Sequence, residues 1–287
     1  MQIVANFVFL SSSYLLIALG LAMLFGVMRI VNYAHGELYM IGGYIFWLST
    51  AFLMGKVDPW VILTIAMVSS VVVTSALGLA LQTGIVSRLS GKPFAIFMCT
   101  LGISYILQVL VIQLAGPIGR SVPPLFPGIF RFAGGIFPIQ RVVVAGFAIT
   151  LLIALWWFLM RTKSGSAIRA AAQNETGAAL QGISMRRVGI ITMMIGAGLA
   201  GIAGVLSGSL LGVTPFMGMA AIWKSFLIVI VGGVGSILGA VLAALLFGFM
   251  DTILTVFGFA RFIALTDAII MLVILTFMPY GLLGERE

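Results

Sequence analysis

The chain has 287 residues, of which 62% are hydrophobic and only 8% are charged, whereas about a quarter of the residues in a soluble domain are charged. So few charges cannot cover a folded domain in water, which excludes a soluble enzyme, a nucleic-acid-binding domain and a disordered chain. The net charge of +8 comes mainly from basic residues between apolar runs, where they set membrane orientation and meet anionic lipid headgroups.

Charged and helix-breaking residues divide the chain into about eight apolar runs. A helix needs about 20 apolar residues to cross the hydrocarbon core, and the runs lack the strict alternation of barrel strands. We therefore expect an all-α polytopic membrane protein, a single transmembrane domain over residues 1–287 with about eight transmembrane helices and some broken or re-entrant segments. The runs are 7–28, 38–54, 60–86, 94–115, 142–160, 188–213, 225–250 and 262–279.

The first two runs are separated by a short polar segment that holds Asn32, His35, Gly36 and Glu37, and Gly42 follows soon after. An ordinary loop is one interpretation. The other is a functional site that dips into the membrane, because an ionisable group at the bilayer centre costs roughly 2.5–3.5 kcal/mol. There Glu37 could meet an ammonium group, and a helix start could meet a carboxylate.

Two segments between the runs differ from ordinary turns. Residues 116–141 contain five prolines and three arginines, which predicts an extracytoplasmic loop or hairpin. Residues 161–187 carry five basic residues against Glu175 alone, which places them in the cytoplasm by the positive-inside rule. Alternation of eight spans then puts both chain termini on the opposite side.

The segment 161–187 contains a soluble-looking helix. Ser166 is a candidate N-cap, and Gly182 is a candidate glycine just past the helix end. Such a helix suits the groove of a partner protein, although an amphipathic helix resting on the membrane is the alternative. Its expected small, apolar docking face consists of Ala170, Ala171, Ala178, Ala179 and Ile183.

The sixth run has a small residue at every fourth position. Small residues at this spacing lie along one helix face and allow a second backbone to approach closely. We interpret the stripe as a packing seam, with a direct role in transport as the alternative. Its members are Gly196, Ala200, Gly204, Gly208 and Gly212.

The seventh run contains Gly232, Gly233, Gly235 and Ser236 close together. Glycine at this density weakens a helix by up to about 1 kcal/mol per residue. Either the helix breaks at membrane depth and lines a pathway, or the glycines serve close packing.

Three charged residues surround the start of the eighth run. Asp251 and Asp267 flank Arg261 in sequence, and we expect a structural ion pair at the membrane interface. Lys224 opens the seventh run and is expected to extend its side chain to the headgroups.

The chain has no chemistry of its own that the sequence reveals. There is no phosphate-binding loop of the G-x-x-x-x-G-K-[ST] type. One histidine and one cysteine argue against a metal site, and no Ser/His/Asp set is apparent. We therefore expect no catalytic residue, no metal and no cofactor in this chain.

Five motifs, in this order, resemble the branched-chain amino-acid ABC importer permeases, specifically their shorter H-type membrane subunit. The resemblance runs over nearly the whole chain. The motifs are residues 26–37 with Gly42-Gly43, residues 169–183, residues 199–204, residues 224–226 with 232–236, and residues 278–284.

The resemblance implies a permease in the cell's inner membrane with several partners. These are a second related permease subunit, two ATPase subunits that bind ATP and Mg²⁺, and a periplasmic or lipid-anchored substrate-binding protein. It implies that the segments Asn32–Glu37 and Gly232–Ser236 line the substrate pathway. It also implies a cytoplasmic segment that couples to the ATPase, with the residues Arg169, Ala170, Ala171, Glu175, Ala179, Gly182 and Ile183.

Other functions remain open at this point. Permeases of the same type serve urea and short amides, and nothing in these residues separates those substrates from leucine. A self-sufficient secondary transporter would need ionisable coupling groups in mid-span, and a passive channel would need no partner.

Overall fold

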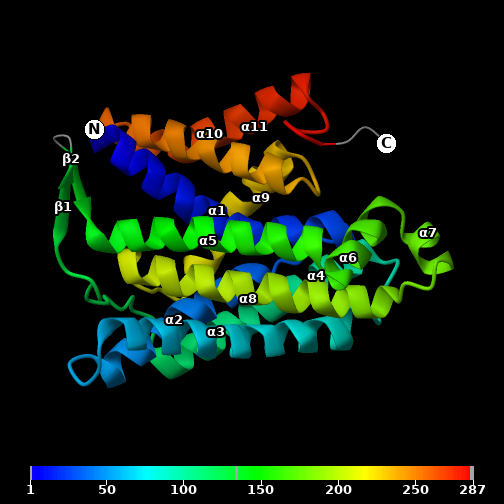
Figure 1. The fold of residues 1–287 in the computed structure, drawn as a ribbon, viewed down its shortest axis with the longest axis horizontal. Coiled ribbons are helices and arrows are strands. Elements are labelled where there is room, and N and C mark those ends of the chain that lie inside the picture. The colour runs from blue at the N-terminus through cyan, green and yellow to red at the C-terminus, as the bar shows by residue number, and fades with distance from the viewer. Residues whose placement is uncertain (1, 133–134, 285–287) are drawn as a thin grey trace.

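A computed structural model describes residues 2–132 and 135–284 as a bundle of long, roughly aligned helices (Figure 1). A π-helical turn, Gln82–Val86, continues α3, and a 3-10 turn, Ala260–Phe262, precedes α11. The helices are α1 (Gln2–Met28), α2 (His35–Leu53), α3 (Pro59–Leu81), α4 (Pro93–Ala115), α5 (Ile139–Arg161), α6 (Lys163–Gln173), α7 (Glu175–Leu180), α8 (Met185–Leu211), α9 (Met217–Gly232), α10 (Ile237–Val256) and α11 (Ile263–Phe277).

Within the described residues, seven helices are long and apolar enough to cross a membrane, namely α1, α3, α4, α5, α8, α10 and α11. The expected fold class, a polytopic helical membrane protein with broken segments, is confirmed. The predicted run 225–250 is divided between two helices, α9 and α10, so of the two interpretations of its glycines the one with a helix break is what the structure has. The chain breaks between them because Gly233 and Gly235 adopt left-handed backbone angles, with φ of 103° and 87°.

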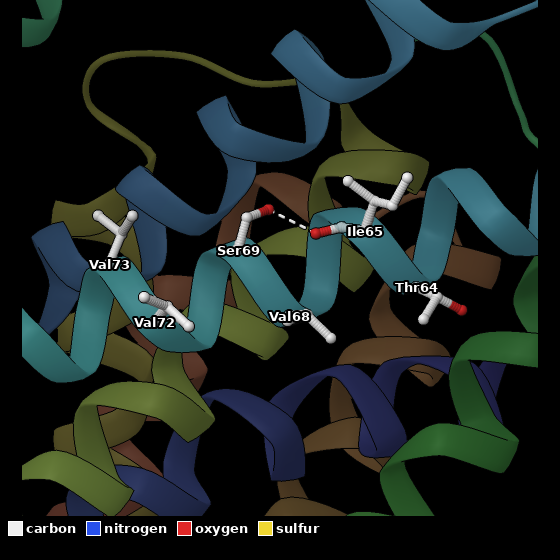
Figure 2. Close-up of a pocket in the computed structure, with 6 residues that line it drawn as sticks. All are labelled: Thr64, Ile65, Val68, Ser69, Val72 and Val73. Atoms are coloured by element: carbon white, nitrogen blue, oxygen red, sulfur yellow. Dashed lines mark hydrogen bonds between the residues drawn. The ribbon is translucent and has the colours of Figure 1, made fainter.

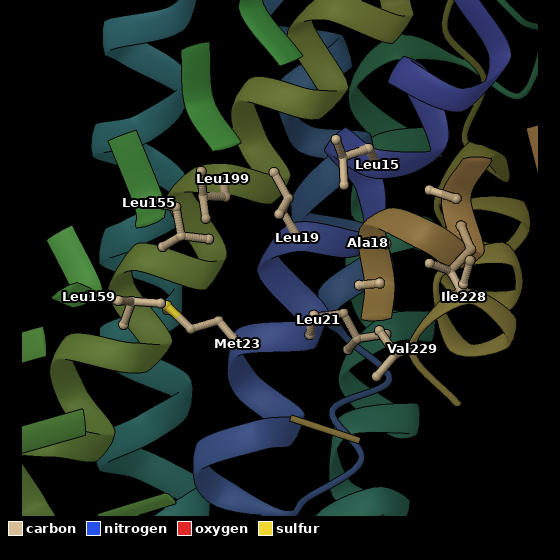
Figure 3. Packing of buried hydrophobic residues seen from close by; sticks show 14 of the residues in the cluster. Leu15, Ala18, Leu19, Leu21, Met23, Leu155, Leu159, Leu199, Ile228 and Val229 are labelled. Atoms are coloured by element: carbon tan, nitrogen blue, oxygen red, sulfur yellow. The ribbon is translucent and has the colours of Figure 1, made fainter. Parts of the chain in front are cut away.

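The packed core surrounds α1. Its side chains Leu15, Leu19 and Met23 lie among buried leucines of α5 and α8 on one side and residues of α9 on the other (Figure 3). Helix α8 is the most buried of the described spans and packs on α1, α2 and α3. These two helices therefore form the frame on which the shorter elements are placed.

The glycine stripe of α8 lies at this contact. A Cβ atom at Gly204 would lie 1.9 Å from the carbonyl oxygen of Tyr39 in α2, and one at Gly196 would lie 3.1 Å from the carbonyl oxygen of Gly20 in α1. Such distances leave no room for a side chain at Gly204. Gly212 differs from the other members, because it follows the last residue of α8 and has a φ of 74°.

Two segments turn back into the bundle and start a helix at mid-depth. After α1, residues 29–34 fold back into the bundle, so that His35 lies beside Gly20. Gly20 is about 12 Å from the end of α1, at 1.5 Å per residue. After α8, residues 212–216 return until Gly218 meets Gly36, and a Cβ at Gly36 would lie 2.3 Å from the Gly218 carbonyl oxygen. The starts of α2 and α9 therefore meet inside the bundle.

The first and last described residues, Gln2 and Gly284, lie at opposite ends of the bundle (Figure 1). The start of α1 contacts the last part of α10, where the rings of Phe7 and Phe249 are 5.9 Å apart. At the other end, the amide of Leu282 donates to the carbonyl of Val231, at 2.8 Å. The prediction that both termini share one side is wrong, because α9 runs only from the middle of the bundle to one end.

The segment 161–187 forms two short helices, not one, at the end opposite the hairpin (Figure 1). The predicted cap Ser166 is wrong, since the Thr162 hydroxyl accepts from the Gly165 amide at 2.9 Å and begins α6. Asn174 then takes an extended conformation, with φ of −152°, and caps α7. Gly182 has a φ of 82°, which confirms its predicted place just past the helix end.

Residues 116–132 and 135–138 cross the other end of the bundle. Their strands β1 (Ile129–Phe132) and β2 (Gly135–Pro138) form an antiparallel hairpin, and Arg120 pairs through its backbone with Val213. The hairpin lies across the start of α5 and near the start of α1 (Figure 1).

Candidate functional site

Glu37 lies in the first turn of α2 and is only 1% exposed. Its Oε1 accepts hydrogen bonds from the Ser104 hydroxyl at 2.8 Å and from the Gln108 amide at 2.7 Å, both on α4. Its Oε2 has no partner among the described residues and faces the start of α9, since a Cβ on Gly218 would lie 2.8 Å from it. The carboxyl group is therefore held by neutral donors, with one oxygen directed at a helix start.

A polar stripe on α4 supplies these donors. Thr100, Ser104 and Gln108 are all buried on one helix face, and the Thr100 hydroxyl accepts from the amide of Tyr33 at 3.1 Å. Sequence reasoning missed these residues. The available signal was their spacing of four residues inside an otherwise apolar run, which places them on one face.

We call the place where the starts of α2 and α9 meet, around Glu37, the junction. Other polar atoms at the junction also lack partners. His35 is 2% exposed, and neither of its ring nitrogens has a hydrogen-bond partner in the described part of the chain. The Asn32 side chain donates to the sulfur of Met193, at 3.5 Å, and its side-chain oxygen has no partner among the described residues. Buried polar atoms are normally satisfied, and Asn32, His35 and Glu37 together hold four of the unpartnered ones in the described residues, so the junction is a candidate site for water or a solute.

Backbone contacts hold the junction together. Besides the Gly36 contact with Gly218, a Cβ at Gly42 would lie 2.1 Å from the carbonyl oxygen of Gly201. The starts of α2 and α9 bring the positive ends of two helix dipoles close to Glu37. This arrangement places a buried carboxylate beside two positive helix ends.

A second polar cluster lies at mid-depth between α1, α9, α10 and α11. The Lys224 ammonium is 2.7 Å from Asp251 and 2.6 Å from Asp267, and the Tyr14 hydroxyl donates to Asp251 at 2.5 Å. The expected pairing of the aspartates around Arg261 is wrong, because the Arg261 guanidinium lies over the ring of Phe262.

The expectation that Lys224 reaches the headgroups is also wrong. Its helix begins halfway through the bundle, so the ammonium group cannot leave the interior and ion-pairs there. The two carboxylates that pair with Lys224 come from α10 and α11, and both lie far from Lys224 in the sequence.

The structure places the two groups of predicted pathway residues apart. Asn32, His35, Gly36, Glu37 and Gly42 meet at the junction, whereas 232–236 lie at the far end of α9, about 24 Å away along a 16-residue helix. There a Cβ at Gly26 would lie 2.6 Å from the Cα of Gly235. Ser236 accepts from the Gly239 amide at 2.9 Å and so caps α10.

The predicted coupling residues divide into inward and outward sets. Ala171 belongs to the main core and Ile183 packs on it, and Ala178 on α7 is also buried. Part of the expected apolar face is therefore covered within the chain. The part of the segment that faces away from the bundle includes Glu175, Ala179, Gly182 and Leu180, whose side chain is 83% exposed. Arg169 contacts the sulfur of Met160, and Ala170 is half-buried.

A hollow of about 410 Å³ on α3 offers no chemistry. Figure 2 shows its lining, which comes from one helix and is formed by four apolar residues with Thr64 and Ser69. The Ser69 hydroxyl donates to the carbonyl of Ile65 and is therefore satisfied. The hollow is therefore an exposed apolar side of a single helix.

Comparison with known proteins gives a full-length likeness. A family model described as a branched-chain amino acid transport system permease component matches residues 3–278. The chain is 32% identical over 299 residues to the high-affinity branched-chain amino acid transport permease protein LivH of Escherichia coli K12, and covers 96% of that protein. It is 33% identical over 297 residues to BraD of Pseudomonas aeruginosa, also covering 96%. It is 28% identical over 301 residues to the permease protein LivM of E. coli and covers 67% of that protein.

Proposed function

The chain belongs to the branched-chain amino acid transport permease family, and from this premise we propose that it is a membrane subunit of an ATP-driven importer of branched-chain amino acids. The likeness to LivH and BraD over the whole chain supports the substrate class. The buried junction around Glu37 supports the place where the solute passes.

The chemistry of the junction suits an amino acid. The free oxygen of Glu37 attracts the substrate ammonium group, and the starts of α2 and α9 attract its carboxylate. Glycines at the contact keep the two helix starts close, so a small relative movement of α2 and α9 opens or closes the passage. A urea or amide substrate lacks the ammonium group and would gain less from Glu37.

The proposed assembly contains a second, related permease, which the weaker likeness to LivM supports. Two ATPase subunits dock on α6 and α7 and bind ATP and Mg²⁺ themselves, while a separate binding protein delivers the amino acid. The five basic residues of 161–187 favour a cytoplasmic location for this end. The exposed Leu180 and Ala179 then form the tip that enters the ATPase.

The pathway is tested by leucine uptake into proteoliposomes that contain the full transporter. Glu37→Gln keeps the side-chain shape and removes the negative charge, so we expect uptake to fall about tenfold or more while the basal ATPase rate is retained. Asp58→Asn is the matched control, because Asp58 is exposed and only caps α3. Unchanged uptake in Glu37→Gln would remove Glu37 from the pathway.

The docking segment is tested by co-purification with the ATPase subunit. Ala179→Asp puts a charge on the exposed tip, and Gly182→Val disturbs the left-handed turn behind it, so both variants should lose ATPase and uptake. Ser87→Asp adds the same charge to an exposed residue after α3 and should bind normally. Normal recruitment by Ala179→Asp and Gly182→Val would contradict docking at this tip.

A further inference from the structure

A second hollow, of about 300 Å³, lies at the hairpin end of the bundle. Unlike the hollow on α3, it is built from three separate elements, the start of α1, the hairpin and the start of α5. Its volume is at the lower limit of small-molecule sites. Its apolar lining includes Ala5, Phe9, Phe130, Ile136, Val142 and Ala145.

Arg141 is the only charged residue in this lining. Its guanidinium donates to the Asn6 side-chain oxygen at 3.2 Å and lies 4.5 Å from the ring centre of Phe9. No carboxylate pairs with it within residues 2–132 and 135–284. These two contacts fix the guanidinium group and leave N–H donors for an anion. Arginine binds phosphate oxygens with charge-assisted hydrogen bonds.

The groove places a cation and an apolar lining where the headgroup and the acyl chain of a lipid would lie. Arg141 is in the first turn of α5, and Asn6 and Phe9 are in the first turns of α1, so the guanidinium lies at headgroup level if these helices cross the membrane. Val142 and Ala145 continue along α5 toward the hydrocarbon. The cation and the apolar lining are therefore arranged in the order of a phosphate and an acyl chain.

We propose that this groove binds one glycerophospholipid, with the phosphate on Arg141 and an acyl chain between α1, the hairpin and α5. The bound lipid ties the hairpin to the starts of two spanning helices. The site is separate from the Glu37 junction and does not depend on the proposed substrate.

The test uses the transporter assembled with its partner subunits and a phosphatidylglycerol that carries a photoreactive diazirine on one acyl chain. After illumination, the labelled peptides are identified by mass spectrometry. We expect the label to concentrate on the starts of α1 and α5. Ala145→Phe fills the groove and Arg141→Gln removes the phosphate contact, and each should reduce this label about tenfold, the effect of about 1.4 kcal/mol.

Matched controls separate the groove from the general lipid surface. Ile153→Phe enlarges an exposed α5 residue that does not line the groove, and Arg131→Gln removes an exposed hairpin arginine that is not among the lining residues. Both should label like the unchanged protein, and Arg141→Lys should recover part of the loss. Size-exclusion chromatography checks that Ala145→Phe still assembles. Arg141→Gln tests the same site without filling the groove.

Three results would overturn the proposal. One is equal labelling of Ala145→Phe and the unchanged protein. Another is a label spread evenly over the outer faces of α3, α4 and α5, as expected of ordinary surrounding lipid. The third is no label in the groove of the assembled transporter, which would mean that a partner subunit covers it.

Discussion

Helices α4 and α11 are the two least buried of the described spans, with 22% and 6% of their most apolar windows buried. Each is attached through buried polar groups to a helix that begins at mid-depth, α4 to α2 and α11 to α9. The chemistry of the two attachments differs. Glu37 meets only neutral donors on α4, whereas Lys224 meets a carboxylate on each of α10 and α11.

The two attachments differ in whether a cation lies beside the carboxylate. At Lys224 one ammonium group pairs with two carboxylates, although Asp251 and Asp267 each keep one oxygen without a partner in the described residues. Within the described residues, the carboxyl group of Glu37 has no cation beside it and keeps one oxygen unpartnered, which is costly in a low-dielectric interior. A solute ammonium group would supply the missing counter-charge at Glu37.

Removing the cation of the Lys224 cluster should have the largest effect. Lys224→Met leaves two buried carboxylates without a counter-charge, and breaking such a pair costs about 3–5 kcal/mol. We expect loss of stable protein in detergent, measured by thermal unfolding. The triple variant Lys224→Met, Asp251→Asn and Asp267→Asn should recover most of the stability. Failure of the triple variant to recover would show that the charges do more than compensate one another.

The contact between α8 and α2 should be the next most sensitive region. Gly204→Leu forces apart the backbones of α8 and α2, where a Cβ has only 1.9 Å, and we expect a loss of at least about 1–3 kcal/mol. Gly102 on α4 has nothing within 4 Å, so Gly102→Ala should leave stability unchanged or raise it by up to about 1 kcal/mol. Thermal unfolding of both variants measures the difference. Similar destabilisation of the two would contradict the close packing of α8 on α2 at Gly204.

Removing the neutral donors tests the attachment of α4. Ser104→Ala with Gln108→Leu leaves the Glu37 carboxyl without its hydrogen bonds, which costs about 1–3 kcal/mol for an unsatisfied buried group. Hydrogen exchange of α4 should increase more than that of α11. Equal exchange in the two helices would mean that Glu37 does not hold α4.

Glu37→Gln should have the smallest effect on stability, under about 1 kcal/mol, because an amide oxygen can still accept from Ser104 and Gln108. Its expected effect is on uptake. If thermal unfolding showed Glu37→Gln to be as damaging as Lys224→Met, the contrast between the two attachments would fail, and Glu37 would be a structural residue.

The sequence alone determined the membrane class, the approximate helix positions, the family and local features such as the glycine turn at Gly182. These depend on composition, run length and neighbouring residues, which are local properties. It also singled out the segment from Asn32 to Glu37 as polar between apolar runs.

Only the tertiary structure decided which polar groups meet. Glu37 contacts Ser104 and Gln108, 67 and 71 residues away, and Lys224 contacts residues 27 and 43 positions away. Both results follow from the two segments that turn back and start α2 and α9 at mid-depth. Hydropathy cannot reveal such a return, because an apolar helix that begins halfway through the bundle has the same composition as one that crosses it.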